Sequence, residues 1–180
     1  AKYLVYILFS TLVTYGFALL IDSLKEKGAG QTLRRRLVAL GLICNFGMLG
    51  IVKYSSFAVE NLNRLFHLNL PGMEILFPLG ISFYTFQSSG YLLDVYWERI
   101  RAERNPFRYA LFVSYFPQLL QGPISRFEQL AHQLYEPHRF ELERVVRGAE
   151  RILWGFFKKM VISDRAAVFS DAIYGDMQTY

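Results

Sequence analysis

Four polar side chains recur at helical spacing inside a long apolar stretch of the sequence. Tyr84, Gln87, Tyr91 and Asp94 are three, four and three positions apart, so on a helix they occupy one face. Residues 77–97 around them, FPLGISFYTFQSSGYLLDVYW, contain a single charged side chain. An acidic side chain near the centre of a membrane costs about 3 kcal/mol. We therefore expect this face to lie against other parts of the protein or against a cavity.

Two roles of this polar face fit the composition equally well. Its side chains could hydrogen-bond to neighbouring helices and hold them together, or they could line a substrate tunnel. A second, irregular segment nearby slightly favours the tunnel, because irregular backbone at membrane depth needs a cavity or a protein partner. With the polar residues of that segment included, the substrate-tunnel candidates are Tyr84, Gln87, Tyr91, Asp94, Gln118, Gln121 and Arg126.

The three histidines do not form a catalytic or metal site by their spacing. His132 and His138 are six positions apart, which does not place both imidazoles on one helix face. His67 lies far from both, and no third ligand is near any of them, so we expect no metal ion. Glycine-rich phosphate loops and the Gly-x-Ser-x-Gly and His-Glu-x-x-His motifs are absent from the sequence. We therefore assign no catalytic residue within this chain.

The composition indicates a membrane protein rather than a nucleic-acid-binding one. Of the 180 residues, 53% are apolar and 17% aromatic, and the charged residues crowd between long uncharged stretches. The net charge is +5, but the Lys and Arg side chains flank the apolar runs instead of forming one basic face with interleaved aromatics. In that position they suit lipid headgroups and membrane topology.

Three apolar runs predict transmembrane helices at about residues 3–21, 37–52 and 75–97. A helix of about 20 apolar residues crosses the hydrocarbon core. The second run is shorter, but its helical pattern continues to Phe66. The loops 22–36 and 98–108 carry five and four basic residues, which marks the cytoplasmic side, so we expect Arg34 and Arg104 on the same side. A soluble helical bundle is the remaining alternative.

Two further segments are predicted to meet the membrane without crossing it. Residues 109–124 are apolar but interrupted by Pro117 and Pro123, with basic residues on both flanks, as in a re-entrant segment. Residues 140–162 place apolar side chains on one helix face and charges on the other, which favours an interfacial helix over a soluble bundle helix. The predicted fold is all-α, a multi-pass transmembrane protein with one membrane-embedded region over residues 1–180.

Several stretches together resemble one protein family. They are FPLGISFYTFQSSGYLLDVYWERI (77–100), NPFRYALFVSYFPQLLQGPISRFEQL (105–130), GFFKKMVISDRAA (155–167) and NFGMLGIVKYSSFAVENLN (45–63). In order and spacing they resemble the membrane-bound O-acyltransferases, in the bacterial branch that includes alginate O-acetyltransferases and teichoic-acid D-alanyl transfer proteins. A lone Pro-Leu-Gly-Ile-Ser is a weak signal, whereas the joint match covers nearly the whole chain.

The resemblance implies a ring of helices around a thinned centre and an enzyme of the bacterial cytoplasmic membrane. An acyl group, which we expect to be acetyl, would come from a cytoplasmic thioester, acetyl-CoA or an acyl group on a carrier protein, and would cross a tunnel. It would then modify a cell-surface or exported polysaccharide, often with a hydrolase-like partner outside the membrane. No bound cofactor and no nucleic acid are implied.

The decisive departure from the family is the expected catalytic histidine, which this sequence does not supply; we also expect the amino-terminal span or spans of the family to be missing. In the family it lies well downstream of the Gly-Phe-Phe-Lys-Lys stretch, and none of the three histidines here has that context. We expect the chain to be an internal fragment of a longer domain, inactive alone, that holds part of the ring and the tunnel wall. The alternative is a non-catalytic scaffold or transporter-like subunit of the same architecture.

Overall fold

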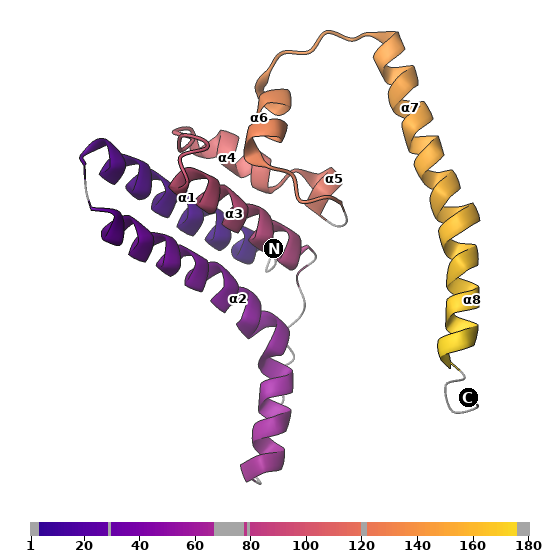
Figure 1. The fold of residues 1–180 in the computed structure, drawn as a ribbon, viewed down its shortest axis with the longest axis horizontal. Helices are drawn as coiled ribbons and strands as arrows, with labels where there is room; N and C mark the ends of the chain where they lie inside the picture. The colour runs from indigo at the N-terminus through magenta and orange to yellow at the C-terminus, as the bar shows by residue number, and fades with distance from the viewer. Residues whose placement is uncertain (1–3, 29, 67–77, 79, 120–121, 176–180) are drawn as a thin grey trace. The chain divides into compact units, whose positions relative to one another are not determined.

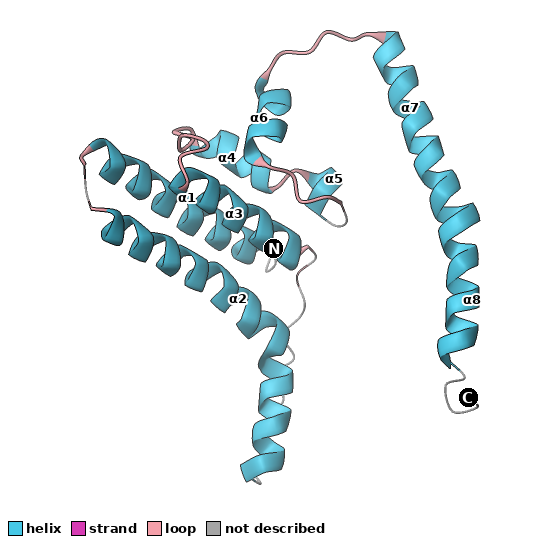
Figure 2. Ribbon diagram, in the orientation of Figure 1, coloured by secondary structure: helices cyan, strands magenta, loops and turns pink. Residues whose placement is uncertain are grey.

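The computed structural model describes residues 4–28, 30–66, 78, 80–119 and 122–175, and within them every regular element is a helix (Figure 2). The predicted all-α fold is confirmed. The chain divides into two units, residues 1–136 and 137–180. The first contains α1 (Leu4–Glu26), α2 (Gln31–Phe66), α3 (Ile81–Tyr96), α4 (Pro106–Val113), α5 (Phe116–Leu119) and α6 (Phe127–Tyr135); the second contains α7 (Leu142–Phe157), a π-helical segment (Lys158–Ser163) and α8 (Asp164–Gly175).

Two of the described helices, α1 and α2, are long and apolar enough to cross a membrane. They include the predicted spans 3–21, apart from residue 3, and 37–52. As expected from the pattern, α2 continues without interruption to Phe66. Large apolar side chains point away from the bundle on both helices, with Leu12 and Ile43 about two-thirds exposed at 66% and 65%. Such a surface suits lipid and would be unfavourable in water.

The third predicted span, 75–97, corresponds in part to α3. That helix covers 16 residues, while residues 75–77 and 79 lie outside the described part of the chain. α3 packs against both α1 and α2, and the three helices lie side by side (Figure 1). Ile81, Leu92 and Val95 of α3 are buried in this bundle, so the core lies on the face opposite the exposed sides of α1 and α2.

A buried amide joins α1 to α2 near the middle of both helices. Asn45 is fully buried, accepts a hydrogen bond from the Ser10 hydroxyl at 2.5 Å and donates to Thr14 Oγ1 at 2.9 Å. It also donates to the carbonyl of Gly41, one turn earlier in α2. Polar side chains that satisfy one another in this way hold membrane helices together.

A close helix contact surrounds this amide. A Cβ atom at Gly41 would lie 2.6 Å from the end of the Leu92 side chain and 3.3 Å from the Phe17 ring. A glycine therefore lets α2 approach α1 and α3 closely, as small residues do at helix interfaces within membranes.

The start of α3 depends on Gly80. Its φ angle is +75°, in the left-handed region that glycine adopts without a steric penalty. A Cβ atom at this position would also lie 2.1 Å from the carbonyl oxygen of Leu119, the last residue of α5. Gly80 thus turns the chain into α3 and at the same time lets the backbone of α5 pack against that turn.

The apolar run 109–124 does not form one long helix. Asn105 caps α4 by accepting hydrogen bonds from the amides of Phe107 and Arg108, with Pro106 at the first helical position. α4 ends at Val113 and α5 covers only four residues. At 1.5 Å per residue neither approaches the thickness of a bilayer, about 30 Å. A cluster of rings from α3, α4 and α6 (Tyr91, Tyr109, Phe112 and Phe127) holds this part against the bundle.

The second unit is a run of helix from Leu142 to Gly175 that widens in the middle. Within the π-helical segment the amide of Asp164 bonds to the carbonyl of Lys159, five residues earlier. Lys159 forms an ion pair with Asp164 across the same turn. The apolar side chains of α7 share one face, as the sequence predicts, and remain exposed within this unit, including Ile152 and Leu153.

Candidate functional site

A pocket of about 240 Å³ opens beside the second half of α3. Four of the seven residues predicted from sequence line it: Gln87, Tyr91, Asp94 and Arg126. The remaining lining residues are Gly90, Leu93, Trp97, Arg99, Ile124 and Ser125. The pocket therefore lies where the polar face of α3 meets the loop that leads into α6.

The polar face of α3 is fixed by contacts with the segments that follow it. The Gln87 amide donates to the carbonyl of Phe112 in α4 at 3.2 Å. The Tyr91 hydroxyl accepts a hydrogen bond from the backbone amide of Glu103 at 2.9 Å. Both side chains are at least 95% buried, so they serve as helix contacts as well as pocket lining. The same residues therefore make helix contacts and line the pocket.

Asp94 has a mixed setting at the mouth of the pocket. Its side chain is mostly buried, with 13% of it exposed, and its carboxylate pairs with the guanidinium of Arg99 at 3.3 Å. That guanidinium also lies over the Trp97 ring, 5.0 Å from its centre. Arg126 precedes α6, with an exposed side chain. The mouth thus combines two guanidinium groups, a carboxylate and an indole ring, which suits a ligand that carries both an anionic and a planar or apolar part.

The other three predicted residues are placed differently. Gln118 does not line the pocket, but its amide donates to the hydroxyl of Ser125, which does, at 2.7 Å. Tyr84 is buried and does not line the pocket, and its hydroxyl has no hydrogen-bond partner among the described residues. Gln121 lies outside the described residues.

The end of α3 is shaped by an unusual turn at Glu98. Its φ angle is +64°, which is disfavoured for any residue other than glycine. The Glu98 amide bonds to the carbonyl of Val95, and the Arg99 amide bonds to that of Asp94. This is the Schellman arrangement, in which the left-handed residue is usually glycine. The reversal brings Arg99 back over Asp94 and Trp97.

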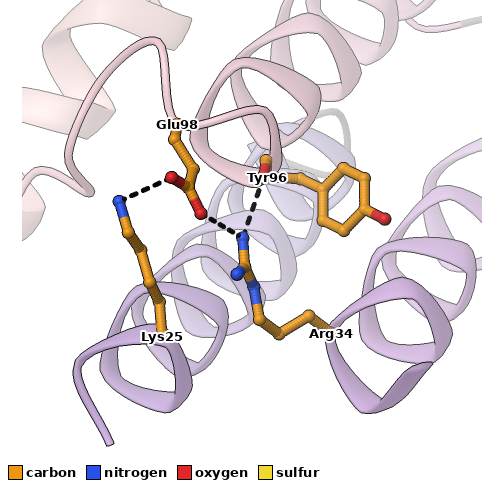
Figure 3. A network of polar contacts seen from close by, with 4 residues as sticks. All are labelled: Lys25, Arg34, Tyr96 and Glu98. Carbon is orange, nitrogen blue, oxygen red and sulfur yellow. Dashed lines mark hydrogen bonds and ion pairs between the residues drawn. The ribbon is translucent and has the colours of Figure 1, made fainter. Parts of the chain in front are cut away.

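Glu98 itself faces the other way, toward the ends of α1 and α2 (Figure 3). Its carboxylate pairs with Lys25 at 3.1 Å and with Arg34 at 3.0 Å. Arg34 also donates to the carbonyl of Tyr96 and lies over its ring. Hydrogen bonds from Lys25, and then from Arg34, hold the pKa of Glu98 below its usual range. A glutamate is ionised at neutral pH in any case, and the lowered pKa means that Glu98 keeps its charge to a more acidic pH than an unpaired glutamate does.

Sequence reasoning missed Trp97, Arg99 and Ser125 as lining residues. On a continued helix Arg99, five positions after Asp94, would point to another face. Only the left-handed turn at Glu98 returns it to the pocket, and a glutamate gives no sign of such a turn in the sequence. The spacing of the polar residues within α3, by contrast, was sufficient to identify their shared face.

The two basic loops lie at the same end of the first unit. Arg34 pairs with Glu98, and Arg104 pairs with Glu26 at the end of α1 at 3.5 Å. We expect cysteines replacing Arg34 and Arg104, in a Cys44→Ser background, to react with a membrane-impermeant maleimide from the same side. A cysteine at Glu60, on the far extension of α2, is the control and should react from the opposite side. Labelling of positions 34 and 104 from different sides would overturn this topology.

The pocket is better suited to binding than to proton transfer. Its only carboxylate is paired with Arg99. Neither His132 nor His138 lines it, and His67 lies outside the described residues. Among the described residues no group of His, Cys, Asp and Glu side chains could hold a metal ion. The arrangement offers charge and hydrogen bonding to a polar group at one end of a helical bundle.

Comparison with known proteins identifies relatives over most of the chain. It is 38% identical over 143 residues to the "Probable alginate O-acetylase AlgI" of Pseudomonas syringae pv. tomato, covering 76% of this chain and 27% of the relative. The protein of that name from Pseudomonas aeruginosa is 36% identical over the same length. The peptidoglycan O-acetyltransferase of Helicobacter pylori is 31% identical, covering 94% of this chain and 36% of the relative.

The chain thus spans between about a quarter and just over a third of the length of these relatives. No protein-family model matches it, and no solved structure matches it significantly.

Proposed function

Since the chain is homologous to membrane-bound O-acyltransferases, among them alginate O-acetylases and a peptidoglycan O-acetyltransferase, we propose that it forms part of such an enzyme. The enzyme passes an acetyl group across the bacterial cytoplasmic membrane for O-acylation of a cell-surface or exported polysaccharide. Two features together support this proposal. The helical bundle has large exposed apolar side chains on its outside, and its polar pocket is lined by residues of the two segments, 77–100 and 105–130, that resemble the family.

Within that enzyme the pocket forms a section of the wall along which the acyl donor lies. The donor is a thioester, acetyl-CoA or an acyl group on a carrier protein. Asp94, Trp97 and Arg99 lie near the end of the bundle that carries the basic loops, which is the cytoplasmic end by the excess of Lys and Arg. A donor from the cytoplasm reaches this end first, and the guanidinium groups of Arg99 and Arg126 suit its phosphates.

The helices take distinct places in the membrane under this proposal. The segment of α3 is a third span beside α1 and α2. The short helices α4 and α5 form a re-entrant segment, whose broken backbone is covered by α3 and α6. α7 lies in the interface, with its exposed apolar face toward the acyl chains and its charged face toward water. A hydrolase-like acyltransferase outside the membrane completes the transfer to the polysaccharide.

Substitution in the pocket tests the functional assignment. We expect Asp94→Ala and Gln87→Leu in the full-length protein to lower acetyl transfer about threefold to tenfold, and to lower membrane abundance much less. Asp94→Ala leaves Arg99 without its partner, and Gln87→Leu removes a hydrogen-bonding group from the pocket wall. Acetyl incorporation into the polysaccharide, divided by the amount of protein in the membrane, is the measurement.

Two substitutions outside the pocket serve as matched controls. Asp22→Ala removes an acid near the same end of the bundle, and Gln129→Leu changes an exposed amide on α6. Both should leave transfer per protein unchanged. If the pocket variants lose abundance and transfer in equal proportion, the polar face only holds helices together. If the unaltered full-length protein transfers no acetyl group, the scaffold or transporter-like alternative takes its place.

A further inference from the structure

The turn at Glu98 sits between two parts of the molecule that have different roles. On one side, its neighbours Trp97 and Arg99 both line the pocket. On the other, its carboxylate reaches Lys25 at the end of α1 and Arg34 in the first turn of α2. Glu98 does not line the pocket. It links the mouth of the pocket to the two neighbouring helices.

A glycine would be the unstrained choice at this position, because the backbone is left-handed and the Schellman hydrogen bonds require that conformation. A glutamate in this left-handed conformation costs more free energy than a glycine does. If only the turn mattered, a glycine would serve better. What glutamate adds over glycine is the pair of contacts with Lys25 and Arg34. Arg34 strengthens the same junction by binding the carbonyl of Tyr96, the last residue of α3, at 3.1 Å.

We propose that Glu98 is a positioning residue for the donor-binding pocket, acting through its ion pairs with Lys25 and Arg34 to hold Trp97 and Arg99 at the pocket mouth. This inference rests on the proposed function for its activity readout. The ion pairs hold the turn against α1 and α2 on the side away from the pocket. Because the turn is held, the guanidinium of Arg99 stays over the Trp97 ring and beside Asp94. Without them the turn can form, but it is no longer fixed relative to the bundle.

Glycine at position 98 separates the two roles of this residue. We expect Glu98→Gly to raise the KM for acetyl-CoA about fivefold in the full-length protein, with kcat and membrane abundance nearly unchanged. Arg34→Gln should have a similar effect, and the double variant should lose less than the sum of the two single effects, because both changes remove the pair between Glu98 and Arg34. Glu26→Gln, which breaks the exposed pair with Arg104 at the same end, is the matched control and should behave as wild type.

A second measurement does not depend on activity. Hydrogen exchange of the backbone amides in the peptide covering 94–100 should be faster in Arg34→Gln than in wild type, and unchanged in Glu26→Gln. A Glu98→Gly variant with wild-type KM, or unchanged exchange in Arg34→Gln, would overturn the positioning role. If wild type transfers no acetyl group while exchange changes as expected, the proposed function fails and the structural link stands.

Discussion

Replacing Gly80 with alanine is expected to destabilise the first unit by about 3 kcal/mol, a large part of the stability of a typical domain. Two penalties add at this position. The φ angle of +75° is costly for alanine, and its Cβ would lie 2.1 Å from the backbone oxygen of Leu119. A backbone atom cannot rotate away as a side chain can, so either the start of α3 or α5 must shift. Membrane abundance and the thermal stability of detergent-solubilised full-length protein measure the loss.

The control for Gly80 is another glycine that has free space around it. Gly16 lies inside α1, and a Cβ there would have no atom within 4 Å. Gly16→Ala should leave stability unchanged or raise it slightly, since alanine favours a helix over glycine. Equal abundance of the Gly80→Ala and Gly16→Ala proteins would contradict the packing of α5 against the start of α3.

Replacing Asn45 with leucine is expected to destabilise the contact between α1 and α2 by about 2 kcal/mol. Leucine keeps the approximate volume but removes the acceptor for Ser10 and the donor to Thr14. Both hydroxyls are buried and would then lack that partner, which costs more than the loss of a hydrogen bond exposed to water. The thermal stability of the solubilised protein is again the measurement.

The same helix offers a matched asparagine as the control. Asn61 also donates to a carbonyl one turn earlier, that of Phe57 at 2.7 Å, but it lies on the exposed extension of α2. Asn61→Leu removes the same local bond without breaking a link between helices, so its effect should be small. If both variants lose equal stability, the buried network does not hold α1 to α2.

The long helices could be predicted from the sequence because their signals are local, whereas the short helix α6 and the helix α8 were not predicted. Uninterrupted apolar runs predict α1 and the first half of α2, and the spacing of Tyr84, Gln87 and Tyr91 predicts the polar face of α3. Periodicity is a property of neighbouring residues, so one sequence is enough to detect it. The assignment of the runs to a membrane follows from the same composition.

The contacts between distant segments could not be predicted in this way. Asn45 is one amide in an apolar run, and its partners in α1 are more than 30 positions away. The sequence predicts a bend at Gly80. It does not predict that the backbone of Leu119 lies against this bend, because that contact depends on how α5 packs against the start of α3. The return of Arg99 to the pocket depends on a left-handed glutamate. Each of these features is decided by packing, which leaves no periodic pattern in the sequence.

The π-helical segment between α7 and α8 changes the phase of the helix that it interrupts. A turn closed by bonds five residues apart holds more residues than an α-helical turn, so each residue advances the direction of its side chain by a smaller angle. A helical wheel drawn through residues 142–157 therefore cannot be extended past Ser163 with the same frame. The directions of the apolar side chains of α8, including Phe169 and Ile173, must be counted in the new frame that begins after Ser163.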